Sequence, residues 1–249
     1  MMRFAPLVFL LSLLAPCAAH AEQVVAALSQ NRISITANFD GSEILIYGAV
    51  KRDTPTPDDG PLDVIITVAG PQKVETIRRK DRRLGIWINV ENTIMGHAPT
   101  FYEVASTRAL SDTLTPLTDS LWKITPDAQI LPAMRGAPAR DALLRLRTAD
   151  ELYRVRENDV EITQDTLFST SVTLPSNLVE GSYTTRILLL REGRVLDSYT
   201  TSINVQKVGI ERWLYRLAQD NAFLYGLLAL LIAGLSGWLA SAGFRLLKR

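Results

Sequence analysis

The sequence contains few of the side chains that most often carry chemistry. It has one cysteine, Cys17, and two histidines, His20 and His97. Cys17 and His20 lie in an amino-terminal segment with the features of a cleaved signal peptide, so the mature chain is expected to keep His97 alone. Without thiols and with one imidazole, a disulfide framework, a thiol nucleophile and a zinc centre with four nitrogen or sulfur ligands are all excluded.

The motifs of the common enzyme classes are also missing. The sequence has no G-x-S-x-G elbow and no glycine-rich phosphate loop. Asp58-Asp59-Gly60 lacks the alternating ligand spacing of a calcium loop, and His97 lies in a loop-like segment with no partner motif. Carboxylates are plentiful, but no pair is singled out as an acid and a base. We therefore expect no enzyme activity, no cofactor and no metal.

No basic surface is large enough to indicate nucleic-acid binding. The chain has 27 basic and 26 acidic residues. Four of the basic residues, Arg3, Arg245, Lys248 and Arg249, lie outside the apolar runs at the two ends, so the body between them is mildly acidic. A mildly acidic body gives no electrostatic basis for binding a phosphate backbone.

Residues 1–21 have the three parts of a signal peptide. Arg3 supplies the basic start, LVFLLSLL from Leu7 to Leu14 is a short apolar run, and Ala19-His20-Ala21 matches a cleavage site before Glu22. The run is too short to cross the hydrocarbon core of a bilayer as a helix. An uncleaved anchor and a lipoprotein on Cys17 are the less favoured alternatives, the latter because Pro16 replaces the expected small residue.

Residues 222–244, AFLYGLLALLIAGLSGWLASAGF, contain no charged side chain and are long enough to cross a bilayer. The basic tail, residues 245–249, favours the cytoplasmic side, while the signal peptide exports the body. The sequence thus predicts a single-pass bacterial inner-membrane protein with a periplasmic body. Small residues spaced by four along the span form a ridge suited to pairing with another helix, in a second copy or a membrane-protein partner: Ala229, Ala233, Gly237 and Ser241.

Short strand-like segments with turn signals between them make up most of the body. The predicted fold class is mainly β, with two immunoglobulin-like antiparallel sandwich units and an intervening helix. The predicted boundaries are 22–125 for the first β domain, 126–157 for the helical connector and 158–208 for the second β unit. A juxtamembrane amphipathic helix follows at 209–221. Whether the two β units form one domain or two stays open, as does the assignment of residues 101–108 to a helical turn or an edge strand.

Gly181-Ser182-Tyr183 enters an alternating strand in the second β unit. This arrangement resembles a tyrosine corner, in which the hydroxyl bonds to backbone a few residues upstream. We therefore assign Tyr183 a structural role rather than a ligand-binding one.

The densest charge cluster lies between two predicted strands. Because arginine binds carboxylate and phosphate well, the cluster is a candidate docking point for an acidic partner or for lipid headgroups. The alternative is a solvated hairpin end. Its basic residues are Arg78, Arg79, Lys80, Arg82 and Arg83.

Four segments in a fixed order together resemble the alphaproteobacterial putative transmembrane protein family. They are EQVVAALSQNRISITANFDGSEILIYGAVKR, RRLGIWINVENTIM, FYEVASTRAL and VGIERWLYRLAQDNAFLYGLLALLIAGLSGWLA. The resemblance implies a single-span inner-membrane protein with a periplasmic body. It brings no activity and no functional residues. It also implies a possible partner, a sulfite-exporter-like permease.

The favoured function is a membrane-anchored periplasmic binding or assembly protein, accessory to a transporter in the inner membrane. A periplasmic ligand-binding or sensor protein is the first alternative, and an envelope hydrolase is the second. The short cytoplasmic tail disfavours a sensor, and the missing motifs disfavour a hydrolase.

Overall fold

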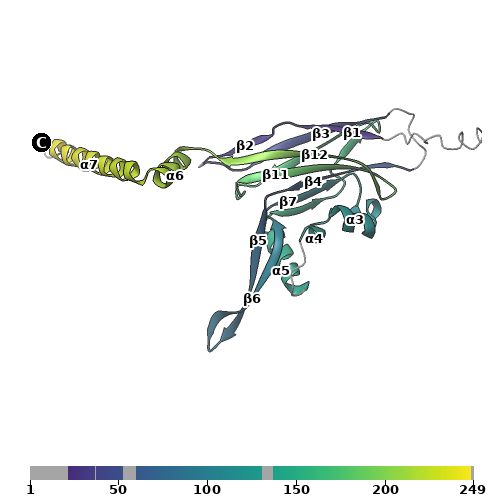
Figure 1. Ribbon diagram of the computed structural model, residues 1–249, viewed down its shortest axis with the longest axis horizontal. Helices are drawn as coiled ribbons and strands as arrows, with labels where there is room; N and C mark the ends of the chain where they lie inside the picture. Colours follow the sequence, from purple (N-terminus) through teal and green to yellow (C-terminus); the bar gives the residue numbers. More distant parts are fainter. Residues whose placement is uncertain (1–21, 37, 53–59, 131–136, 248–249) are drawn as a thin grey trace, which may run out of the picture.

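The computed structural model describes residues 22–36, 38–52, 60–130 and 137–247 (Figure 1). The predicted signal peptide and the Asp58-Asp59 turn lie outside the described residues. The strands are β1 (Gln23–Leu28), β2 (Arg32–Ile35), β3 (Ser42–Lys51), β4 (Leu62–Ala69), β5 (Gln72–Arg83), β6 (Ile86–Pro99), β7 (Tyr102–Ser106), β8 (Tyr153–Arg156), β9 (Glu161–Thr163), β10 (Leu167–Leu174), β11 (Gly181–Arg191) and β12 (Arg194–Lys207). The helices are α2 (Leu110–Thr113), α3 (Pro116–Trp122), α4 (Pro126–Gln129), α5 (Ala137–Ala149), α6 (Ile210–Asp220) and α7 (Ala222–Leu247).

Two sheets face each other across one hydrophobic core. The first has the strand order β1-β3-β10-β9, and the second has the order β2-β12-β11-β4-β7-β8. Most neighbouring strands are antiparallel, but β2 runs parallel to β12 and β7 runs parallel to β8. β3 shows why these residues form a sandwich: Ile44, Ile46 and Val50 are buried, while Leu45 and Tyr47 between them are exposed. This period of two places one face of the strand in the core.

The mainly β class, with antiparallel sheets and a C-terminal apolar helix, is confirmed. The strands assigned from the sequence to two separate sandwich units, however, share both sheets. β10 pairs with β3 over eight residues, and β11 pairs with β4 over another eight. The two predicted units are therefore one sandwich, because long-range pairing joins the end of the body to its beginning.

Helices cover the outer face of the second sheet (Figure 1). The Arg186 guanidinium on β11 donates hydrogen bonds to the carbonyl oxygens of Trp122 (2.8 Å) and Lys123 (3.1 Å) at the end of α3. The Tyr102 hydroxyl on β7 donates to the Ile124 carbonyl oxygen at 2.7 Å. Because this sheet is covered on both sides, β4 is buried along almost its whole length. Residues 102–106, whose structure the sequence left open, form the strand β7.

The predicted connector helix is present as α5, which begins at Ala137 and ends at Ala149. Leu143 is buried and Leu146 is exposed, and Tyr153 lies beyond the helix in the strand β8. The predicted role of Tyr183 is confirmed: its ring is fully buried, and its hydroxyl donates to the Val179 carbonyl oxygen at 2.9 Å.

Two consecutive helices follow the sandwich. α6 and α7 are separated by Asn221, whose backbone leaves the helical conformation (φ −143°, ψ 67°). Within α7, residues 222–241 form one helix that is long and apolar enough to cross a membrane. At 1.5 Å per residue, 20 helical residues extend about 30 Å, the thickness of a hydrocarbon core. The helix continues past the predicted boundary at Phe244 to Leu247.

Candidate functional site: a projecting β-hairpin

Strands β5 and β6 form a hairpin that leaves the sandwich and runs across the direction of its strands (Figure 1). The hairpin is a sheet of its own, with two strands paired from Gln72–Pro99 at the base to Arg83–Ile86 next to the turn. Twelve residues of β5 at roughly 3.4 Å each give the hairpin a length of about 40 Å. The two predicted strands on either side of the charge cluster belong to this hairpin and not to the sandwich.

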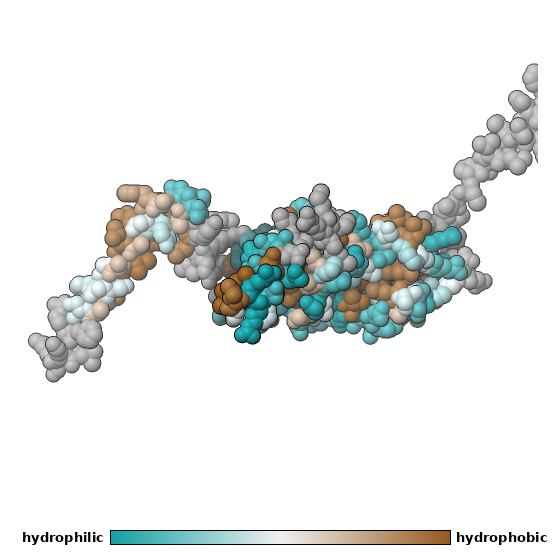
Figure 2. All heavy atoms as spheres, turned by 90° about the horizontal axis from the view of Figure 1, so that it is seen from below, coloured by the Kyte–Doolittle hydropathy of each residue, from teal (hydrophilic) through white to brown (hydrophobic). Residues whose placement is uncertain are grey.

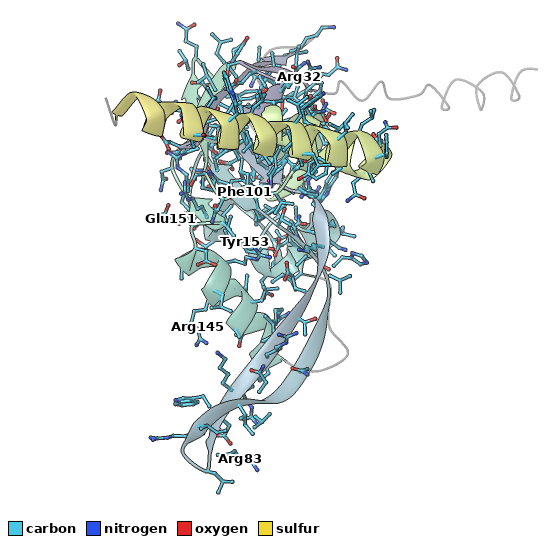
Figure 3. All side chains as sticks on the ribbon, turned by 90° about the vertical axis from the view of Figure 1, so that its left-hand side faces the viewer. Arg32, Arg83, Phe101, Arg145, Glu151 and Tyr153 are labelled. Carbon is cyan, nitrogen blue, oxygen red and sulfur yellow. The ribbon has the colours of Figure 1, made fainter. Side chains whose placement is uncertain are left out.

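The base of the hairpin is held firmly. The Gly70 amide donates to the Phe101 carbonyl oxygen (2.8 Å), and the Thr100 amide donates to the Pro71 carbonyl oxygen (3.0 Å). Helix α5 packs against both strands, and its Arg147 forms an ion pair with Glu75 of β5. Figure 3 shows α5, with Arg145 labelled, beside the upper part of the hairpin, and Arg83 at the far end beyond the helix. The base is thus rigid, while the far end extends past its support.

The base lies at the end of the sandwich from which the chain leaves for α6 and α7. A Cβ on Gly181 would lie 2.9 Å from the Pro71 ring, so β11 begins against the first residues of the hairpin. Gly181 pairs with Val205 on β12, and the chain reaches Gly209, the residue before α6, four residues later. The turn at Gly193, between β11 and β12, lies at the opposite end of these two strands. The hairpin therefore emerges close to the membrane anchor.

Residues 78–89, which we call the hairpin tip, are all exposed. The five basic residues singled out from the sequence, Arg78, Arg79, Lys80, Arg82 and Arg83, all lie in it on β5. They share the tip with one acidic residue, Asp81. The structure thus gathers the predicted docking residues on one surface, at the end of a projecting arm rather than at the edge of a compact sandwich.

Large apolar side chains lie beside these basic residues, and the sequence analysis missed them. Leu84, Ile86, Trp87 and Ile88 are 104, 64, 68 and 40% exposed. Figure 2, which views the molecule from the hairpin side, shows hydrophobic atoms directly beside hydrophilic ones where the tip faces the viewer. The available signal was an apolar segment immediately after a basic run. This segment was predicted to be a sandwich strand, because periodicity alone does not show whether a second layer covers a strand.

The apolar side chains occur on both faces of the two-stranded tip. Arg82 pairs with Trp87, while Asp81 pairs with Ile88 and Arg83 pairs with Ile86. Directly opposite residues share a face, and successive residues alternate between faces. Trp87 therefore lies on one face with Arg82, and the two isoleucines lie on the other with Arg83. Each face presents a cation next to an apolar side chain.

A second cluster of charged side chains surrounds the buried Glu103, and its other members, Arg156 and Asp159, are partly exposed. Glu103 on β7 is 1% exposed, and one of its carboxylate oxygens lies 3.5 Å from a guanidinium nitrogen of Arg156. Arg156 also forms an ion pair with Asp159 at 2.7 Å and donates to the Ser171 carbonyl oxygen on β10 at 2.6 Å. Burial raises the pKa of Glu103 to about 7, although Arg156 and Arg154 oppose the shift. Arg156 lies on β8 of the second sheet and bonds to β10 of the first. We therefore interpret the cluster as a structural link that holds the two sheets together along this edge.

The described residues bring together no group of three or more His, Cys, Asp or Glu side chains that could hold a metal ion. His97 lies on β6 opposite Val74 and is exposed. The expectations of no enzyme activity, no cofactor and no metal stay predictions.

The small-residue ridge of the span is open. Ala229, Ala233, Gly237 and Ser241 are all exposed on α7, and a Cβ added at Gly237 would meet no atom within 4 Å. Pairing of this ridge with another helix stays a prediction, which copurification from mild detergent would test.

Three comparisons relate the chain to known proteins. A family model described as "Putative transmembrane protein (Alph_Pro_TM)" matches residues 23–246. No curated protein matches the chain. Among solved structures, the chain is similar to Spo0M, a sporulation control protein from Bacillus subtilis, with 12% sequence identity and a TM-score of 0.31. The match covers 81% of this chain and 56% of that one.

Proposed function

We propose that this chain, which belongs to the family described as "Putative transmembrane protein", is a membrane-anchored binding or assembly protein. In this proposal it makes its contacts through the hairpin tip. In this proposal the signal peptide exports the sandwich to the periplasm, α7 crosses the inner membrane once, and the basic carboxyl end stays in the cytoplasm. An accessory role beside an inner-membrane transporter is part of the same proposal.

The observation that carries the proposal is the exposure of the hairpin tip. Burying one large apolar side chain is worth about 1.5–3 kcal/mol, so a folded protein gains by covering such groups. The tip instead holds Leu84, Ile86 and Trp87 in solvent, at the end of an arm of about 40 Å. A two-stranded ribbon is only marginally stable by itself in water. An arm of this kind, braced at its base by α5, is well suited to contact something outside the molecule.

The place where the hairpin leaves the sandwich supports the same function. The hairpin leaves the sandwich beside the Gly181–Val205 pair, near the connection to α6. The base of the arm is therefore close to the connection with the candidate membrane span, which supports a role for the hairpin at the membrane surface. Five basic side chains against one acidic one give the tip a charge opposite to that of the rest of the body, which favours an acidic or anionic partner.

Photo-crosslinking in native membranes tests this proposal. A photoreactive amino acid replacing Trp87 is expected to give a crosslinked adduct with a membrane component. The matched control replaces Leu121 on α3, which is about equally exposed (71% against 68%). Leu121 lies at the other end of the sandwich, since Thr118 of the same helix donates to the Gly193 carbonyl oxygen.

The double variant Arg82→Glu, Arg83→Glu should lose the adduct. Equal crosslinking at both positions, or none at position 87, would contradict the proposal.

A further inference from the structure

The distribution of side chains over the hairpin tip narrows the choice of partner. We infer that the hairpin tip binds the anionic surface of the bilayer in which α7 is anchored, with its apolar end inserted among the lipids and its basic residues against the headgroups. This inference rests on the proposed function, because it names the partner of the same surface.

Both faces of the tip carry large apolar side chains. Trp87 lies on one face, and Ile86 and Ile88 lie on the other. A flat protein surface that docks against a two-stranded ribbon covers one face and leaves the other in water. The interfacial region of a bilayer surrounds an inserted ribbon on all sides, and tryptophan in particular prefers this region.

Charged and apolar side chains follow an order along the arm that also favours a lipid partner. Leu84, Ile86 and Trp87 lie at or next to the turn, while Arg78, Arg79 and Lys80 lie farther back on β5. Arg82 and Arg83 lie beside the apolar end, opposite Trp87 and Ile86, and long arginine side chains can extend their charged groups toward the headgroups. Basic residues beside and behind an apolar end match the layers of an anionic membrane, in which phosphates lie outside the hydrocarbon. Each Lys or Arg near such a surface contributes about 1 kcal/mol, and arginine also forms paired hydrogen bonds with phosphate oxygens.

The hairpin is also long enough, and close enough to the connection with α6, for its tip to reach the bilayer. The hairpin base is two strands away from β12, or about 10 Å at the spacing of neighbouring strands. Gly209, the residue before α6, has φ 141°, a conformation that glycine adopts far more readily than other residues. No side chain on Gly209 restricts the connection between the sandwich and the anchor. A tilt of the sandwich at this residue brings an arm of about 40 Å to the bilayer surface.

A fluorescent probe in nanodiscs tests the inference on the full-length protein. The variant Ile86→Cys is labelled with an environment-sensitive dye and reconstituted in phosphatidylcholine, or in phosphatidylcholine mixed with phosphatidylglycerol. The dye is expected to shift to the blue and to be quenched by a lipid-attached quencher only when phosphatidylglycerol is present. A dye on Leu121→Cys should stay in water in both lipids. High salt should release the tip, because the attraction is screened.

Removing charge provides the quantitative test. The ratio of inserted to free tip in Arg82→Gln and Arg83→Gln should fall about fivefold for each charge removed, which is the factor that corresponds to 1 kcal/mol per basic residue. Both side chains are exposed on the ribbon, so the circular dichroism spectrum should not change.

The remaining outcomes separate the two proposals. A dye at position 86 that stays in water in both lipids overturns the lipid inference. If that dye is nevertheless shielded in native membranes and position 87 crosslinks to a protein, the partner is a protein and the proposed function stands. If position 87 crosslinks to nothing as well, both proposals fail.

Discussion

Replacing Gly48 by alanine is expected to destabilise the sandwich by about 3 kcal/mol, near the upper end of the usual cost of overpacking a core. Gly48 is an inward position of β3, and β1 and β10 pair with it on either side. A Cβ there would lie 2.5 Å from the Val25 carbonyl oxygen and 2.9 Å from the Ala26 Cβ, and it would overlap the Phe168 ring. Backbone on one side and a buried ring on the other leave no direction in which the new methyl group can relax.

Urea unfolding of the full-length protein in mild detergent measures this cost. The control is Gly226→Ala in α7, where an added Cβ meets nothing within 4 Å, and it should leave the unfolding of the sandwich unchanged. Because Phe168 is one of the groups overlapped, Gly48→Ala and Phe168→Leu together should cost less than the sum of the two single changes. An unfolding midpoint for Gly48→Ala equal to that of the unmodified protein would show that β1 and β10 do not enclose this position.

The second large effect is a dependence of stability on pH. Burial raises the pKa of Glu103 to about 7, above its ordinary value of 4.5, so the folded state binds the proton more tightly than the unfolded state. The stabilisation by this proton is complete below pH 4.5 and is lost as the pH rises through 7. With about 1.4 kcal/mol per pKa unit, the loss is on the order of 3 kcal/mol.

Glu103→Gln imitates the protonated carboxyl and should remove most of this dependence. Arg156 keeps Asp159 and the Ser171 carbonyl oxygen as partners, so the variant leaves it paired. Free energies of unfolding at pH 5 and pH 8 should differ less in the variant than in the unmodified protein, and the variant should be the more stable of the two at pH 8. The matched control is Glu161→Gln, an exposed carboxylate on β9. A variant less stable than the unmodified protein at pH 8 would show that the Glu103–Arg156 ion pair outweighs the cost of burial.

Local patterns in the sequence predicted the local structure well. Strand-like segments between turn signals predicted strands such as β3, Gly-x-Tyr predicted the buried Tyr183 and its hydrogen bond, and an uncharged run predicted α7. Each of these depends on neighbours within about ten residues. β10 pairs with β3, and β11 pairs with β4, through residues that are more than 100 positions apart in the sequence. The periodicity of a short segment does not indicate which distant strand it pairs with. One sandwich was therefore predicted as two.

The candidate site was predicted in part. The five basic residues of the hairpin tip were identified by charge density, which is a local property. The apolar half of the tip was not, because Ile86 and Ile88 alternate like any half-buried strand. Whether such a strand is covered depends on a second layer, and the sequence does not show where that layer ends. Glu103 was missed for a similar reason, since its burial comes from elements on either side of it in space.

Both proposals require that the chain crosses the bilayer once, with the sandwich and its hairpin outside and the carboxyl end inside. Labelling of single cysteines in intact spheroplasts with a membrane-impermeant maleimide tests it most directly. A cysteine at Glu192, in the turn between β11 and β12, should react before the cells are opened. A cysteine added after Arg249 should react only once the membrane is made permeable. The opposite pattern, or a full-length protein that stays in solution without detergent, would contradict the account.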